Sequence, residues 1–238
     1  MLCKKRLCKK SACTMTFSSL WLLLFCLSPI HETYADTGMT EAELERWFNK
    51  DDSFPVQVDE GQLVFLSAKP EKPVLHAITE LTIKQQSIIS SWVNLSQCYK
   101  HLDPVASTAV VYQYQSMKNL RILSTQNIGS ANVVNQTIEL ENVLPDAQLC
   151  IAAEVKIFNR LSDNTFSLVN GPYHRKFLDG YFPYHISLSI HYPESKLKII
   201  GTSPAPQSGF QVKSDENKIM FDSVFAGKLT IEAIFEQR

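Results

Sequence analysis

Apolar side chains recur at every second position in five separate segments of this chain. In the clearest of them, residues 184–192, tyrosine, isoleucine and leucine alternate with histidine and serine. The same alternation occurs in residues 75–83, 110–114, 149–157 and 229–235. A strand with one buried and one solvated face requires this period of two, whereas a helix requires a period near 3.6. The pattern therefore predicts β-strands and restricts the chain to folds that bury one face of each sheet.

Residues typical of turns separate these segments. They are Asp103-Pro104, 127–129, Pro145-Asp146, 170–172, 204–209, 215–217 and 226–227. Apart from one short N-terminal stretch, no segment shows a sustained helical period, so the crossover helices of a parallel α/β sheet are missing. Many short strands with frequent turns predict an all-β protein built as an antiparallel sandwich.

Residues 140–151 resemble the corner between the fifth and sixth strands of fibronectin type III and other immunoglobulin-like domains. Leu140, Val143 and Pro145 match the apolar and proline positions of that corner, while Leu149 stands where the family has a tyrosine. The resemblance implies a sandwich but no particular activity. The expected fold is therefore one or two antiparallel immunoglobulin-like or fibronectin-III-like sandwiches.

The first 35 residues have the layout of a secretory signal peptide. A basic head at residues 4–10 is followed by an eleven-residue apolar run from Phe17 to Leu27 and by small residues ending at Ala35. The run is too short to span a bilayer easily. We expect cleavage after Ala35 and a periplasmic or secreted protein; a segment that stays uncleaved would tether the protein to the membrane.

The rest of the chain is expected to have three parts. Residues 36–54 form a short helical segment, because Thr40 and Glu43 make a capping box just before apolar residues at helical spacing. Residues 55–172 form a β-sandwich domain that contains a disulfide. Residues 173–238 form either a second sandwich-like region or a continuation of the first.

Cleavage would leave two of the six cysteines, Cys98 and Cys150. In an oxidising compartment, a lone pair of cysteines usually forms a disulfide. Cys150 shares one face of its strand with Gln148, Glu154 and Lys156, opposite the apolar set. We therefore expect a Cys98–Cys150 disulfide that joins neighbouring or edge strands on the outer face of a sheet. The inter-sheet bridge of antibody domains is not expected.

Charge and motif content argue against several functional classes. After cleavage the chain has 18 basic and 23 acidic residues, a net charge of −5, and no run of lysine or arginine, which argues against nucleic-acid binding. His185 and His191 share a strand face but lie about 20 Å apart, too far to bind one metal ion. Serine-nucleophile motifs and glycine-rich phosphate loops are missing from the sequence. We expect a protein without metal, cofactor or enzymatic activity.

Aromatic side chains gather near the start of the third part. The candidate interaction surface consists of Tyr173, Arg175, Tyr181, Phe182 and Tyr184. Such residues are enriched in binding surfaces, although they would also serve to fill a junction between two sandwiches. The leading hypothesis is a non-catalytic module that binds a protein partner in the cell envelope or serves as an accessory or assembly subunit. The alternatives are a carbohydrate-binding module that uses Tyr173, Tyr181 and Tyr184, and a hydrolase with a site assembled in space.

Overall fold

The computed structural model describes residue 40 and residues 61–67, 70–177, 180–193 and 195–238. The expected signal peptide and N-terminal helix lie outside these residues. The strands are β1 (Val64–Phe65), β2 (His76–Thr82), β3 (Trp92–Leu102), β4 (Val105–Val111), β5 (Met117–Val134), β6 (Thr137–Lys156), β7 (Phe158–Arg160), β8 (Thr165–Tyr173), β9 (Lys176–Phe177), β10 (Gly180–Tyr181), β11 (Tyr184–His191), β12 (Leu197–Ser203), β13 (Phe210–Asp215), β14 (Lys218–Ala226) and β15 (Leu229–Gln237). A four-residue helix, α2 (Ser87–Ser90), joins β2 to β3.

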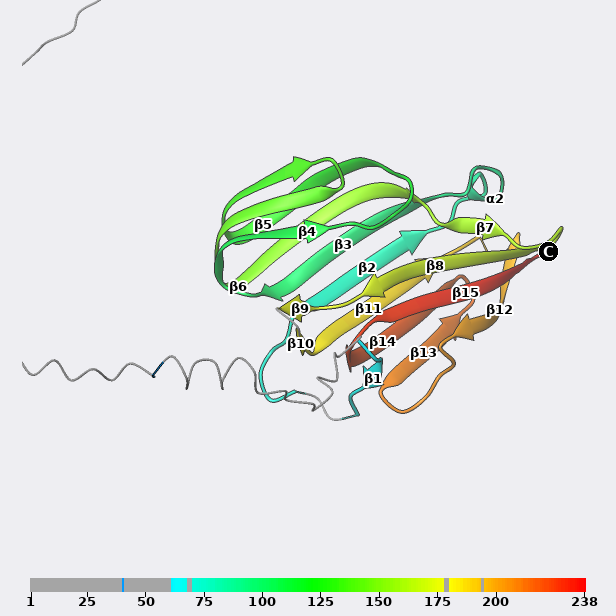
Figure 1. Cartoon of the computed structure of the whole chain (residues 1–238). Helices are drawn as coiled ribbons and strands as arrows, with labels where there is room; N and C mark the ends of the chain where they lie inside the picture. Colours follow the sequence, from blue (N-terminus) through cyan, green and yellow to red (C-terminus); the bar gives the residue numbers. More distant parts are fainter. Residues whose placement is uncertain (1–39, 41–60, 68–69, 178–179, 194) are drawn as a thin grey trace, which may run out of the picture. The chain divides into compact units, whose positions relative to one another are not determined.

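These strands form two main sheets. The large sheet has nine strands in the order β1-β14-β11-β2-β3-β6-β4, with β13 also paired to β14 and β5 to β6. The small sheet has the order β12-β15-β8-β7, and β9 pairs with β10 as a separate two-stranded ribbon. Figure 1 shows β8 and β15 lying across β2, β11 and β14 as a second layer. The expected all-β sandwich, mostly antiparallel, is confirmed.

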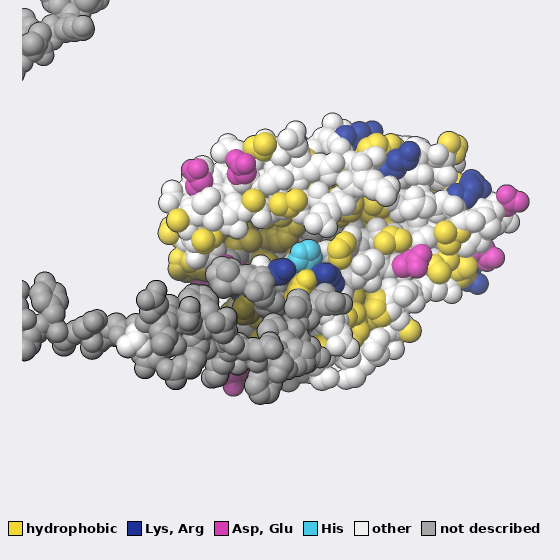
Figure 2. Space-filling view, in the orientation of Figure 1, with side chains coloured by type: hydrophobic (Ala, Val, Ile, Leu, Met, Phe, Trp, Pro, Cys, Tyr) yellow, Lys and Arg dark blue, Asp and Glu magenta, His cyan; other side chains and the backbone are white. Residues whose placement is uncertain are grey.

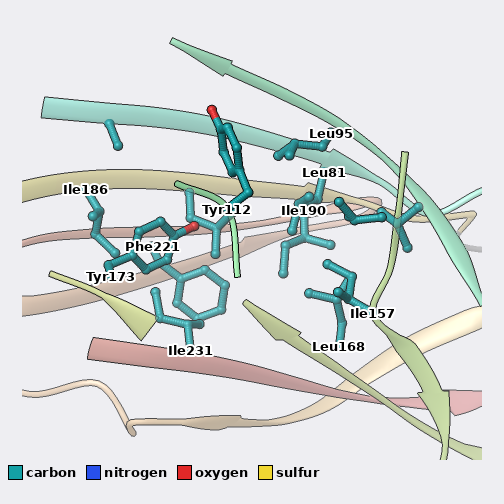
Figure 3. Close-up of a cluster of buried hydrophobic side chains, with 14 of the residues drawn as sticks. Leu81, Leu95, Tyr112, Ile157, Leu168, Tyr173, Ile186, Ile190, Phe221 and Ile231 are labelled. Atoms are coloured by element: carbon teal, nitrogen blue, oxygen red, sulfur yellow. The ribbon is translucent and has the colours of Figure 1, made fainter. Parts of the chain in front are cut away.

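Alternating side chains from both sheets form the core. In β11 every second residue is buried, as the sequence pattern predicts. Figure 3 shows Leu81, Leu95 and Ile190 of the large sheet on one side of the core, and Leu168 and Ile231 of the small sheet on the other. Full burial of each such side chain is worth about 1.5–3 kcal/mol, so the stacking of the two sheets is driven mainly by this layer.

One pair of strands in the large sheet runs parallel. β2 and β11 pair in parallel, with His76 opposite His185, whereas the neighbouring pairs β2–β3 and β11–β14 are antiparallel. Strands from both sides of residue 172 therefore lie in the same sheet. The division of the chain at that residue stays a prediction.

Three expected turns are instead irregularities inside strands, and one of them, residues 170–172, lies within β8, where the register with β15 shifts between Leu229 and Ile231. Asn127 lies within β5 and Asp146 within β6, and each has a φ of 57°. The register of the β5–β6 pair shifts between Gln126 and Ile128, and the Asn127 side-chain amide donates to the Pro145 carbonyl at 3.0 Å. Asn and Asp tolerate the left-handed conformation that a bulge requires, so residue types typical of turns mark bulges here. The corner that residues 140–151 resemble is thus absent, because β6 continues through it.

The disulfide forms as expected. Cys98 on β3 lies directly opposite Cys150 on β6, and the Cα atoms are 4.1 Å apart. Both cysteines are half-buried, while their neighbours Tyr99 and Leu149 are buried in the core. The bridge therefore joins adjacent strands on the outer face of the large sheet and does not link the two sheets.

Candidate functional site

A cavity of about 510 Å³ opens where β4 and the chain after it approach the end of β8. Five tyrosines line it: Tyr99, Tyr112, Tyr114, Tyr173 and Tyr184. We call it the tyrosine cavity. Figure 2 shows this face hollowed, with hydrophobic atoms visible inside the hollow and histidine and basic atoms beside it. Its volume lies within the range typical of ligand pockets, about 300–1,000 Å³.

Asn170 of β8 connects two of the tyrosines. The Tyr173 hydroxyl donates to the Asn170 Oδ1 atom, and the Asn170 Nδ2 atom donates to the Tyr114 hydroxyl at 3.1 Å. Asn170 is fully buried, and both its amide oxygen and its amide nitrogen have a hydrogen-bond partner. This network holds the two tyrosine rings in place.

Gln97 of β3, on the opposite wall, also makes two side-chain hydrogen bonds. The Tyr99 hydroxyl donates to the Gln97 Oε1 atom at 2.9 Å, and the Gln97 Nε2 atom donates to the Thr79 hydroxyl at 2.8 Å. Tyr112 differs, because its buried hydroxyl interacts with the Tyr99 hydroxyl and not with an amide. The Tyr99 hydroxyl itself donates to Gln97.

The walls of the tyrosine cavity are uncharged at neutral pH. Burial raises the pKa of Tyr99, Tyr112, Tyr173 and Tyr184, and it raises the pKa of Tyr114 to about 12. All five phenols therefore stay protonated in the physiological range. The cavity presents apolar ring faces together with neutral hydroxyl and amide groups.

The mouth of the cavity carries charge. Arg175 makes a bidentate ion pair with Asp103, with its Nε atom 2.9 Å from Oδ2, and its guanidinium lies 5.7 Å from the centre of the Phe182 ring. Lys176 and His174 also line the opening, and the buried His174 Nδ1 atom has no hydrogen-bond partner among the residues that the structure describes. Asp103 holds Arg175 in place and offsets its charge. The charge of Lys176 then gives the rim a net positive charge.

The structure divides the candidate interaction surface in two. Tyr173 and Tyr184 are buried in the cavity wall, with ring centres 6.3 Å apart and ring planes at 73°. The segment that begins with Arg175 at the mouth continues through Tyr181 and Phe182. Phe182 is 41% exposed. Part of this set is therefore accessible only through the cavity.

Sequence reasoning missed most of the cavity. Tyr112 and Tyr114 were expected only as strand residues and Asn170 only as part of a turn, and Tyr99 and Gln97 were given no structural role. One signal was available. Gln97 falls among apolar residues on the inward face of its strand, where a buried polar side chain needs a hydrogen-bond partner. The convergence of β3, β4, β8 and β11 on one hollow depends on strand order, which the sequence does not contain.

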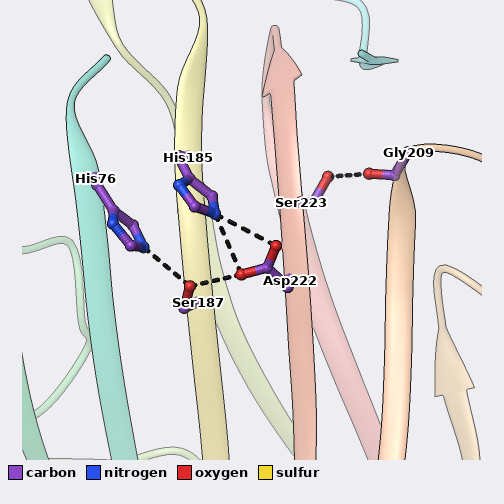
Figure 4. Close-up of polar contacts among 6 residues, drawn as sticks. All are labelled: His76, His185, Ser187, Gly209, Asp222 and Ser223. Carbon is purple, nitrogen blue, oxygen red and sulfur yellow. Dashed lines mark hydrogen bonds and ion pairs between the residues drawn. The ribbon is translucent and has the colours of Figure 1, made fainter. Parts of the chain in front are cut away.

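A second polar cluster lies on the outer face of the large sheet (Figure 4). The Nε2 atom of His185 is 3.1 Å from Asp222, the Ser187 hydroxyl donates to Asp222 at 2.6 Å, and the Nε2 atom of His76 lies 2.9 Å from the Ser187 hydroxyl. The two imidazole rings stack with centres 3.8 Å apart. In a hydrolytic triad the carboxylate orients the histidine and the histidine takes the serine proton. Here the serine donates to the carboxylate itself, so this is not the arrangement of a triad.

We expect the protein to lose stability as the pH falls from about 6.5 to 4. Burial and then the charge of His185 lower the pKa of His76 to about 4. Burial alone would raise the pKa of Asp222, but hydrogen bonds from His185 and Ser187 outweigh it and lower the pKa. The unfolded chain therefore binds protons more readily than the folded protein over this window, and acid favours unfolding. Because His76 is partly solvated, its share is roughly 1 kcal/mol.

Urea unfolding at several pH values measures this effect. The His76→Gln variant should show a flatter dependence of unfolding free energy on pH between about 6.5 and 4. The His191→Gln variant, which removes a histidine outside the cluster, should keep the slope of the unmodified protein. An equal slope in all three proteins would show that His76 is not responsible.

Within the residues that the structure describes, no three His, Cys, Asp or Glu side chains are placed to hold a metal ion. The same residues contain no helix with the length and apolar character needed to cross a membrane.

Comparison with known proteins gives little similarity. No family model matches the chain, and no curated protein matches it. Among solved structures, the M1 zinc metallopeptidase from Deinococcus radiodurans matches 68% of this chain and 41% of its own, with 13% identity and a TM-score of 0.35. A two-domain M1 zinc metallopeptidase variant bound to L-tryptophan matches 68% and 42%, with 12% identity and a TM-score of 0.35. The chain thus spans less than half the length of either, and similarity at this level does not establish a common fold.

Proposed function

We propose that this protein is an exported, non-catalytic binding module of the cell envelope that holds a segment of a partner protein in the tyrosine cavity. The observation that carries the proposal is the cavity itself: about 510 Å³, lined by five tyrosines and bordered by a charged rim. Tyrosine beside arginine is the composition of the centre of a protein interface.

The chemistry of the walls favours binding over catalysis. No serine or cysteine is among the described residues that line the cavity, and the phenols stay neutral because burial raises their pKa. Hydrolysis would need a nucleophile with an adjacent base. Neutral donors and acceptors around aromatic rings instead suit a ligand that is held and released unchanged.

The ring geometry favours a protein segment over a sugar. A flat sugar-binding platform needs two exposed, coplanar rings, whereas Tyr173 and Tyr184 are buried and meet edge to face at 73°. A side chain entering the cavity would contact ring faces and edges on several sides, as an anchor residue does in a protein interface.

The disulfide supports the compartment. Structural disulfides persist in oxidising environments such as the periplasm and the extracellular space. The Cys98–Cys150 bridge therefore agrees with the signal-like layout of the first 35 residues. We propose the periplasm or the extracellular space as the site of action.

We expect the Ala109→Trp variant to lose its partner. Ala109 is exposed and lines the cavity, so an indole at this position occupies space that the partner requires. Tagged exported protein is recovered from an envelope extract of the producing organism, and the co-purified proteins are quantified by mass spectrometry. A partner held by the unmodified protein should be depleted at least tenfold with the variant.

The matched control is Ile200→Trp, which places the same large side chain on β12, at a position that is 51% exposed and not among the residues lining the cavity. This control should recover the partner at the unmodified level. Recovery by Ala109→Trp at that same level would exclude the tyrosine cavity as the binding site and would overturn the proposed function.

A further inference from the structure

β4 borders the tyrosine cavity with its edge. Four consecutive residues, from Thr108 to Val111, line the cavity. Successive side chains of a strand point to opposite faces of the sheet. A wall built from consecutive residues therefore presents the backbone edge of the strand, not one of its faces.

That edge has backbone groups without partners. Within the described residues, β4 pairs only with β6, in a register that places Val110 opposite Ile138 and Thr108 opposite Leu140. The Tyr112 N–H donates to the Gln136 carbonyl at 2.9 Å, so in this register the even-numbered residues of β4 hydrogen-bond to β6.

The odd-numbered residues alternate with them. Ser107, Ala109 and Val111 consequently direct their N–H and C=O groups away from β6. The described part of the chain gives these groups no backbone hydrogen bond. Together they offer one edge of a ladder about five residues long.

A second open edge lies across the cavity. β7 pairs with β8 only as far as Leu168, and one further hydrogen bond joins the Val169 N–H to the Ile157 carbonyl at 3.4 Å. Beyond that point β8 pairs with β15 as far as Tyr173, and its other side has no strand partner among the described residues. The cavity therefore separates two strand edges, one from each sheet.

We propose that the occupant of the tyrosine cavity is an extended segment of a partner protein, which adds to the edge of β4 as a further strand from Ser107 to Val111. This proposal rests on the proposed function and specifies how the partner binds. Strand addition satisfies the open backbone groups of β4 whatever the partner's sequence. Its inward side chains enter the cavity, where they contact the tyrosine rings.

The composition of the cavity and its rim specifies the segment further. The tyrosine rings accept a large apolar or aromatic side chain. Among the described residues that line the mouth, Lys176 is exposed, Arg175 is half-buried, and Asp103 is the one acidic residue that offsets them. The charge complement of this rim is an acidic side chain next to the apolar anchor.

A library of random linear ten-residue peptides, displayed on phage and selected on the exported protein, tests the proposal without knowledge of the partner. The tightest peptide is synthesised, and its dissociation constant is measured by fluorescence anisotropy. Two further versions carry N-methyl groups on alternate backbone amides, one in each register. Strand addition predicts that at least one register weakens binding tenfold or more, because N-methylation removes the donors that face β4.

Variants of β4 provide the second arm. Ala109→Pro removes an outward N–H while Thr108 and Val110 keep their bonds to β6, so it should weaken peptide binding at least tenfold. The control is Ile200→Trp on β12, outside the cavity, which should bind within about twofold of the unmodified protein. Near-ultraviolet circular dichroism verifies the fold of each variant. If Ala109→Pro does not fold, the binding of the N-methylated peptides to the unmodified protein tests strand addition instead.

Each remaining outcome has a definite meaning. Failure to select any peptide, binding of both N-methylated versions within about twofold of the parent peptide, or peptides that bind Ala109→Trp unchanged would overturn strand addition. Dimerisation of the protein that Ala109→Trp abolishes would assign the edge of β4 to a second copy of this chain and would also overturn it. The proposed function still stands if Ala109→Trp releases the envelope partner while Ala109→Pro retains it.

Discussion

Removal of the Cys98–Cys150 disulfide is expected to lower the free energy of unfolding by about 4 kcal/mol. The bridge closes a loop with a sequence separation of 52 residues, and the chain-entropy relation assigns about this value to a loop of that size. The double variant Cys98→Ala/Cys150→Ala should therefore unfold at a lower urea concentration. Its melting temperature should fall by roughly 8–16 °C. Urea titration and calorimetry measure the two quantities.

The position of the bridge makes the result interpretable. Both cysteines lie on the outer face of the large sheet, so alanine at these positions leaves the apolar core intact. Ser96→Ala, on the same face of β3, is the matched control and should change stability by less than about 0.5 kcal/mol. If the unmodified protein unfolds at the same urea concentration with and without reductant, the disulfide does not contribute as described.

The Phe235→Ala variant is expected to lose about 3–5 kcal/mol of stability. Phe235 of β15 is fully buried, and its ring centre lies 5.9 Å from that of Phe158 and 5.2 Å from that of Tyr192. Its removal takes away apolar burial and leaves a cavity that the surrounding strands cannot close. Urea unfolding followed by intrinsic fluorescence gives the difference in free energy.

Ile200→Ala is the control for this truncation. Ile200 lies on β12, which pairs with β15, but its side chain is 51% exposed. Its loss should cost less than about 0.5 kcal/mol. Equal losses for Phe235→Ala and Ile200→Ala would contradict the assignment of the core to the layer between the two sheets.

The fold class follows from the sequence because burial on one face of a strand produces an alternation that is visible residue by residue. Residues 184–192 and 149–157 show this directly, and both lie on strands in the large sheet. The location of the disulfide was predicted for the same reason, since the outward parity of Cys150 placed the bridge on the outer face; its formation was expected because an oxidising compartment favours pairing of the two cysteines left after cleavage. These features are local, and a single strand is enough to define them.

Only part of the candidate site could be predicted from the sequence. Tyr173 and Tyr184 were identified as part of an aromatic cluster, but their burial in a shared cavity depends on β8 and β11 lying in different sheets. Tyr112 reaches the same cavity from a segment more than fifty residues away. The bulges at Asn127 and Asp146 could not be told from turns, because both structures use the left-handed conformation.

The parallel pair of β2 and β11 determines when the large sheet can be completed. β2 belongs to the early part of the chain, yet one of its two neighbours is made much later, as the 111-residue separation of His76 and Ser187 shows. Until β11 arrives, β2 retains an uncovered edge that another nascent chain can pair with. Contacts so distant in sequence also form slowly. The yield of correctly folded protein therefore depends on the time and concentration at which that edge stays uncovered, and not only on the stability of the finished sandwich.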